Sequence, residues 1–146
     1  MNDAIYRRII EGSPDAIILG DREGVIRLWN AGAEAMFGFT AEEVIGKSMD
    51  VIIPERLRPR HWEGYSKTME TGTSRYGSGD LLAVPAVRKD GATISIEFTI
   101  QMLKDSDGRI SGAVATIRDQ TKRFQREKEQ AQRLKALEAR LRDDER

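Results

Sequence analysis

The chain contains one histidine, His61, and no cysteine, so few of its side chains could bind a metal or act as a nucleophile. A neutral imidazole can supply one ligand to a transition metal. A zinc hydrolase needs several histidine or carboxylate ligands, and thiolate clusters, disulfides and covalent heme attachment all need cysteine. His61 is therefore a candidate for a single metal ligand and not for a multi-histidine site.

A helix is predicted around His61. Larger side chains recur after it at three- and four-residue spacing, at Trp62, Tyr65 and Met69. Proline and glycine bound the stretch at Pro54, Pro59 and Gly72. His61 would lie in the first turns, where the helix dipole disfavours protonation and favours the neutral imidazole that a metal requires. The alternative is an ordinary histidine on the surface of this helix.

The elements that would position this helix are short strands and short helices. Apolar and alternating runs predict strands at 16–19, 25–29, 81–87, 93–103 and 110–118, separated by Gly-containing turns. Helices are predicted at 5–10, from the cap Asn30 to Phe37, and after the Thr40 to Glu43 capping box. Two strands, several short helices and three strands predict an α+β domain with an antiparallel sheet whose inner face meets the helices.

The last part of the chain, 120–146, has no glycine or proline and is rich in Lys, Arg, Glu, Gln, Ala and Leu, which predicts one long helix. Leu134, Leu137 and Leu141 have the spacing of a coiled-coil seam, which predicts a homodimer through this helix. A solvated charged tail is the alternative. The predicted division is an N-terminal helix at 1–12, a central domain at 13–119 and the C-terminal helix at 120–146.

Composition and motifs exclude several classes of function. The 24 basic and 24 acidic residues cancel, so nucleic acid is not expected as a partner. The apolar runs are far shorter than the ~20 residues of a membrane span, so a cytoplasmic protein without a membrane partner is expected. The sequence shows no Walker A, GxSxG or HExxH motif, so an enzyme is not expected.

Several segments together resemble a PAS domain over residues 5–121: Ile26-Arg27-Leu28-Trp29-Asn30, Ala33-Glu34-Ala35-Met36-Phe37-Gly38-Phe39, Glu42-Glu43-Val44-Ile45-Gly46-Lys47, Lys89-Asp90-Gly91 and Asp119-Gln120-Thr121. The resemblance implies the PAS fold, a five-stranded antiparallel sheet with short helices on one face, followed by a long C-terminal helix. It also implies that Asp119-Gln120-Thr121 joins a sensor domain to a signalling helix. A domain of this family senses or couples and rarely catalyses.

The stretch Ile53-Pro54-Glu55-Arg56-Leu57-Arg58-Pro59-Arg60-His61, followed by Tyr65, resembles the proximal-histidine helix of the heme-binding PAS sensors, namely the FixL-type oxygen sensors and the heme-PAS direct oxygen sensor. This resemblance implies heme b as the cofactor, His61 as the axial iron ligand and Tyr65 beside it. The spacing from His61 to Tyr65 is one residue longer than in those proteins. Lys67, with Arg60 and Arg75, would supply positive charge to the heme propionates.

The distal side departs from these relatives. Leu82 stands where FixL-type sensors have an arginine, and Asp80 lies near the position of the methionine of the other sensor. The predicted pocket is apolar, lined by Leu81, Leu82, Ile96, Phe98 and Ile100, the last three on one face of their strand. Such a pocket favours neutral CO or NO over a polarised O2 complex.

The resemblance leads to two functional hypotheses. The first is a heme-b sensor of a diatomic gas (O2, CO or NO) or of redox state, which relays the signal through the C-terminal helix to a downstream output domain or protein. The second is a heme-free PAS dimerisation and interaction module, or a sensor of a non-covalent flavin or another small ligand. A cysteine-dependent flavin photoadduct is excluded because the chain has no cysteine.

Overall fold

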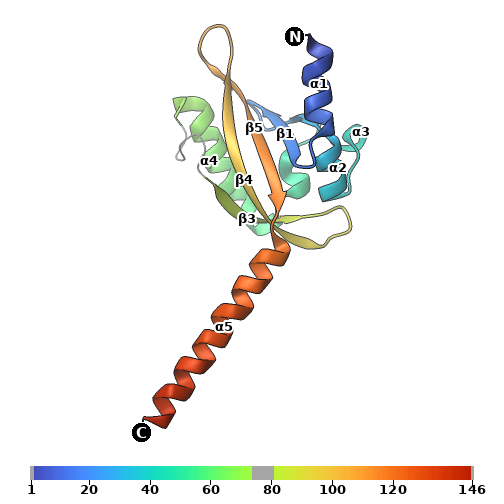
Figure 1. Ribbon diagram of the computed structural model, residues 1–146. Helices are drawn as coiled ribbons and strands as arrows, with labels where there is room; N and C mark the ends of the chain where they lie inside the picture. The colour runs from blue at the N-terminus through green and yellow to red at the C-terminus, as the bar shows by residue number, and fades with distance from the viewer. Residues whose placement is uncertain (1, 74–80, 146) are drawn as a thin grey trace.

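The computed structural model describes residues 2–73 and 81–145 (Figure 1). The strands are β1 (Ala16–Asp21), β2 (Ile26–Trp29), β3 (Leu82–Val87), β4 (Thr93–Lys104) and β5 (Ile110–Asp119). They form one antiparallel sheet in the order β2-β1-β5-β4-β3. The α+β prediction of a five-stranded antiparallel sheet is confirmed.

The helices of the N-terminal half are short. They are α1 (Asp3–Gly12), α2 (Ala31–Phe37), α3 (Ala41–Val44), the 3-10 turns η1 (Met49–Ile52) and η2 (Glu55–Leu57), and α4 (Arg58–Thr71). Asn30 caps α2, and Thr40 and Glu43 form the predicted capping box of α3. Gly72, at φ +72°, ends α4 in the left-handed conformation that glycine adopts without steric cost.

The hydrophobic core lies between the inner face of the sheet and these helices. Alternate residues of the strands point inward, so Ala16 and Ile18 of β1 share the core with Ile94 and Ile96 of β4. The helices contribute buried side chains to the same core, at Ala33, Phe37, Val44 and Ile52. Burial of one face against a helical layer is the common solution for a sheet of this kind.

Two predicted strands began one residue too early, and three ended too early, β1 by two residues and β4 and β5 by one. β2 begins at Ile26 because Val25 belongs to the preceding turn, where its amide donates to Asp21 Oδ1 at 2.9 Å, and because it bridges to Ser48. β3 begins at Leu82, the first residue paired with β4. The edge strand β3 also carries Pro85, opposite Ser95 of β4.

Asn30 ties the N-terminal elements together. Its side chain accepts hydrogen bonds from the amides of Ile17 at 2.8 Å and Ala33 at 2.9 Å, and donates to the carbonyls of Ile10 at 2.8 Å and Asp15 at 3.0 Å. Its exposed fraction is 0%. Two donor bonds and two acceptor bonds engage all the polar atoms of this buried amide, so α1, β1 and α2 meet at one side chain.

Lys89, in the β3–β4 turn, is joined to Glu43 of α3 by a hydrogen-bonded ion pair of 2.6 Å. The bond from Lys89, together with that from the Thr40 amide, lowers the pKa of Glu43 from 4.5 to about 2.

Lys89→Ala is therefore expected to raise the pKa of Glu43 part of the way back, which an NMR titration of the side-chain carboxyl would measure. The folded pKa lies below the unfolded one, so the pair stabilises the protein above about pH 4.5 and its contribution is lost as the pH falls through about 2.

Lys128→Ala, the same change on the C-terminal helix, is the control and is expected to leave the Glu43 titration unchanged. An unchanged Glu43 pKa in Lys89→Ala would contradict the assignment of the shift to this ion pair.

The long helix α5 (Thr121–Asp144) confirms the predicted C-terminal helix, which begins one residue later than expected because Gln120 is its cap. It projects away from the sheet, with the two chain ends at opposite ends of the molecule (Figure 1). Leu134, Leu137 and Leu141 are 54–64% exposed along it. Among the described residues, no helix combines the length and the apolar character needed to cross a bilayer.

Candidate functional site

His61 is the fourth residue of α4 and is half-buried. Its Nδ1 atom is buried and has no hydrogen-bond partner in the part of the chain that the structure describes. Burial lowers the pKa of His61, while the Asp50 carboxylate opposes this shift. The imidazole is therefore held toward its neutral form, the form that binds iron.

Two aromatic rings of α4 flank the imidazole. The Trp62 ring meets it edge to face, with ring centroids 4.6 Å apart, and the Tyr65 ring lies 5.8 Å away. Trp62 also donates from Nε1 to Asp50 Oδ1 at 2.6 Å, which ties α4 to η1. These contacts restrict the orientation of the His61 ring from the side of its own helix.

The same two aromatic residues anchor α4 to the β1–β2 turn. The Tyr65 hydroxyl donates to the carbonyl of Asp21, and burial, with the charges of Asp21 and Glu23, raises the pKa of Tyr65 to about 12. The Trp62 ring covers Gly24, where a Cβ atom would lie 2.1 Å from a ring carbon. Because Gly24 has φ +80°, both backbone conformation and close approach require glycine there. The Tyr65 hydroxyl is thus engaged within the protein.

The inner face of the sheet supplies an apolar wall. Leu82, Phe98 and Ile117 are directly opposite one another on β3, β4 and β5, and residues opposite in antiparallel strands point to the same face. In the next row, Ile100 faces the small side chain of Ala115. Leu82, Phe98 and Ile100 are half-buried, so their apolar surface is incompletely covered.

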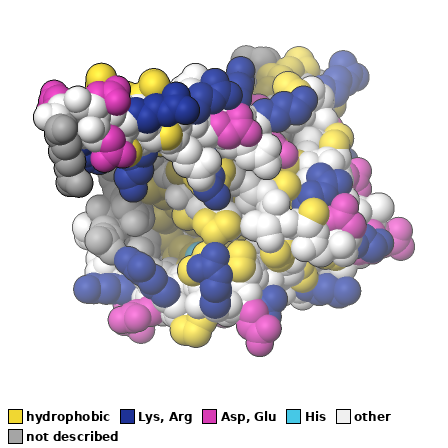
Figure 2. Space-filling model, turned by 90° about the horizontal axis from the view of Figure 1, so that it is seen from below, with side chains coloured by type: hydrophobic (Ala, Val, Ile, Leu, Met, Phe, Trp, Pro, Cys, Tyr) yellow, Lys and Arg dark blue, Asp and Glu magenta, His cyan; other side chains and the backbone are white. Residues whose placement is uncertain are grey.

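Figure 2 shows a hollow on the face seen from the α5 end, with hydrophobic side chains around it, Lys and Arg side chains at its rim and a small area of histidine surface inside. His61 is the only histidine of the chain. An imidazole beside an apolar hollow with cations at its rim fits the needs of heme, which has an iron atom, an apolar ring and two anionic propionates.

The other predicted site residues differ from one another in their burial. Ile96 is 4% exposed and packs in the hydrophobic core rather than at an open surface. Leu81 precedes β3 and is 63% exposed, and Lys67 and Arg60 are exposed on α4. Arg75 and Asp80 lie outside the described residues. His61 and Tyr65 are therefore brought together on α4, and Leu82, Phe98 and Ile100 on the sheet.

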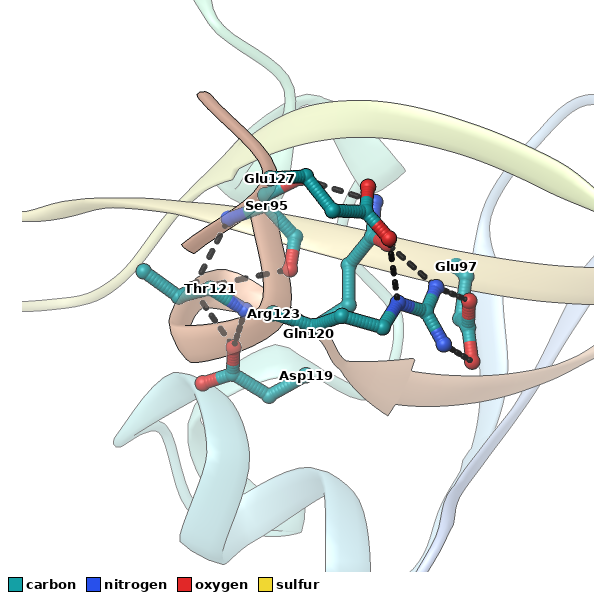
Figure 3. Close-up of polar contacts among 7 residues, drawn as sticks. All are labelled: Ser95, Glu97, Asp119, Gln120, Thr121, Arg123 and Glu127. Atoms are coloured by element: carbon teal, nitrogen blue, oxygen red, sulfur yellow. Dashed lines mark hydrogen bonds and ion pairs between the residues drawn. The ribbon is translucent and has the colours of Figure 1, made fainter. Parts of the chain in front are cut away.

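The junction between β5 and α5 is held by side-chain hydrogen bonds to β4 (Figure 3). The Thr121 hydroxyl donates to Asp119 Oδ1 at 2.5 Å and accepts from the Ser95 amide at 3.0 Å. The Gln120 amide donates to the Ser95 carbonyl at 2.8 Å, and Arg123 forms an ion pair with Glu97. The start of α5 is thereby fixed to the first half of β4.

Ser95, Glu97 and Arg123 were not predicted from the sequence. Their only signal was indirect: Glu97 stands at an outward position of an alternating strand, and Arg123 stands two residues after Thr121 in the first turn of a helix.

Comparison with protein families gives one match over most of the chain, in which the model described as "PAS fold" covers residues 4–120. The chain belongs to the PAS family. PAS domains are sensory modules, and the sheet and short helices described above are those of this fold.

Three curated relatives are similar to this PAS domain. An uncharacterised protein of Azorhizobium caulinodans is 34% identical over 77% of the chain and 15% of its own length. The sensor protein FixL of Bradyrhizobium diazoefficiens is 33% identical over 64% of the chain, and the oxygen sensor protein DosP of Escherichia coli is 29% identical over 80%. The match covers 18% of FixL and 14% of DosP, so the chain spans less than a fifth of the length of any of the three.

Solved structures give the same fold at lower sequence identity. A PAS domain from Colwellia psychrerythraea superposes with a TM-score of 0.67 at 22% identity, over 82% of this chain and 99% of that chain. An RNA-binding light-oxygen-voltage receptor superposes with a TM-score of 0.73 at 20% identity, over 90% of this chain and 37% of that chain. The PAS fold thus occurs in receptors of different signals.

Proposed function

We propose that this PAS domain binds heme b with His61 as the axial iron ligand and senses a diatomic gas or a redox state. The observation that carries the proposal is the half-buried His61 imidazole beside an apolar hollow, with a buried Nδ1 that has no partner among the described residues. In metal sites, the imidazole nitrogen that does not bind the metal normally has a hydrogen-bond partner, for example a water molecule. Lys67 and Arg60, exposed on the same helix, are the candidates to neutralise the propionates.

The half-buried apolar side chains of Leu82, Phe98 and Ile100 support a preference for CO or NO over O2. Bound O2 carries partial negative charge and is stabilised by a hydrogen-bond donor, whereas CO and NO depend on one much less. None of these three side chains offers such a donor. Discrimination among O2, CO and NO would thus depend mainly on the absence of a hydrogen-bond donor beside the bound gas.

The proposed output path leads from the sheet to α5. The Asp119-Gln120-Thr121 junction is bonded to Ser95, so a displacement of β4 would reach the first turn of α5. We propose a sensor unit at 13–119, after an N-terminal helix at 1–12, and a signalling helix at 120–146 that forms a homodimer through Leu134, Leu137 and Leu141. The unit would work in the cytoplasm without catalytic activity of its own and would pass its signal to an output domain or partner protein.

Titration of the purified protein with hemin tests the proposal. A saturable Soret band is expected at one heme per chain, and CO added to the reduced protein is expected to shift that band. Parallel titrations with FMN and FAD are expected to give no bound flavin spectrum. Absence of a Soret band at stoichiometric hemin, or retention of flavin instead, would overturn the heme proposal.

The second candidate is a PAS interaction module without heme. It is favoured by the contacts of the His61 ring with Trp62 and Tyr65, which an ordinary histidine packed on its own helix would also make. In that case His61 is a residue of the α4 surface, and a colourless protein that is dimeric in solution is the expected observation.

A further inference from the structure

Arg123, in the first turn of α5, has carboxylates on two different elements within reach (Figure 3). One is Glu97 of β4, which Arg123 contacts through both terminal nitrogens, and the other is Glu127, one turn further along α5, at 3.7 Å from Arg123 Nε. Arg123 also donates to Gln120 Oε1 at 2.6 Å. One guanidinium therefore joins the sheet, the junction and the helix.

We propose that competition between Glu97 and Glu127 for Arg123 sets the direction in which α5 leaves the sheet. When Arg123 pairs with Glu97, the first turn of α5 is fastened to β4. When it pairs with Glu127 alone, the bond lies within the helix and no longer holds it to the sheet. The proposal rests on the proposed function only in treating α5 as the output helix, and it does not depend on a cofactor.

The two carboxylates differ in their surroundings, and this favours the fastened state. The Glu97 side chain is only 12% exposed, whereas that of Glu127 is 66% exposed. A shielded carboxylate that loses its cation is poorly compensated by water, whereas an exposed one is readily solvated. The bond to Glu127 is an i,i+4 pair on an exposed helix, a contact that contributes little to stability.

The ion pair between Arg123 and Glu97 is called the clamp below. A movement of β4 at the candidate site would be transmitted to this clamp, because Glu97 is part of the same strand. Glu97 lies between Ile96 and Phe98, whose side chains point to the inner face while that of Glu97 points to the outer face. A displacement of β4 that accommodates a ligand at Phe98 would therefore move the Glu97 carboxylate as well. Because Ser95 on the same strand holds Gln120 and Thr121, the clamp and the junction would move together.

The absence of cysteine makes a direct measurement simple. Cysteines introduced at the exposed positions Gln101 on β4 and Gln132 on α5 would carry spin labels, and no native cysteine has to be removed first. Pulsed electron–electron double resonance reports the distribution of the β4–α5 distance. The protein is heme-free and is diluted with unlabelled chains to suppress distances between copies. Hydrogen exchange of the Phe124 amide, which donates to the Gln120 carbonyl at 2.8 Å, reports the first turn of α5.

Glu97→Gln and Arg123→Gln are expected to broaden and shift the distance distribution and to speed Phe124 exchange about fivefold, the effect of losing one partly exposed ion pair. Glu127→Gln is expected to leave the distribution as narrow as in the native chain or to narrow it. Glu129→Gln, which breaks the i,i+4 pair of Glu129 and Arg133 away from the sheet, is the matched control and should change nothing.

The proposal is overturned if Glu97→Gln and Glu129→Gln give the same distribution, or if Glu127→Gln loosens α5 as much as Glu97→Gln does. Because the measurement uses heme-free protein, a failure of heme binding would leave its outcome unaffected, and a failure of the clamp would leave the hemin titration unaffected.

Discussion

His61→Ala is expected to abolish nearly all of the Soret band that hemin gives with the native protein. His61 supplies the only imidazole of the chain, and no cysteine is present to replace it as a ligand. Truncation to alanine leaves a space of about the size of imidazole beside the Trp62 and Tyr65 rings. Free imidazole in the millimolar range is therefore expected to restore the band in His61→Ala.

Glu63→Ala, at an exposed position two residues further along α4, is the matched control and is expected to bind hemin as the native protein does. Circular dichroism of both variants checks that α4 is retained. A Soret band of native strength in His61→Ala, or a lost band that imidazole does not restore in a folded protein, would contradict ligation by His61.

Asn30→Ala is expected to lower the free energy of unfolding by about 3–5 kcal/mol, because four buried or partly buried backbone groups each lose a hydrogen bond. The amides of Ile17 and Ala33 and the carbonyls of Ile10 and Asp15 all lose a bond to this side chain. Urea denaturation followed by tryptophan fluorescence measures the effect, since Trp29 is in the core and precedes Asn30 directly.

Two further variants separate the contributions. Asn30→Asp retains both acceptor bonds but removes both donor bonds, and it is expected to be less stable than the native chain. Asn2→Ala removes the exposed cap of α1, a single bond of 3.2 Å to the Ile5 amide, and is expected to cost less than about 1 kcal/mol. A loss in Asn30→Ala no larger than that in Asn2→Ala would show that the network contributes little.

Local signals in the sequence predicted most of the fold. The capping box of Thr40 and Glu43, the cap at Asn30 and the glycine that ends α4 each act within a few residues, so their effect is visible in a short window of sequence. The strand order β2-β1-β5-β4-β3 was not visible in this way and was not predicted. Asn30 illustrates the limit, because one of its four bonds is local and the others reach Ile10, Asp15 and Ile17.

The candidate site was predictable only in part, for the same reason. The position of His61 early in α4 followed from prolines and periodicity, whereas the contact of Trp62 with Gly24 depends on how α4 crosses the β1–β2 turn. The pair of Glu97 and Arg123 joins residues 26 positions apart. With 24 acidic and 24 basic residues, a sequence allows a great many such pairs, and only packing selects one.

The length of α5 gives small movements at its base a large effect at its end. Its 24 residues extend about 36 Å at the usual helical rise of about 1.5 Å per residue. If the helix stays straight, a tilt of about 10° at Arg123 would carry its far end sideways by about 6 Å, more than one helical pitch. The helix therefore acts as a lever arm, and the amplification is already present in the geometry before any second chain or output domain is attached.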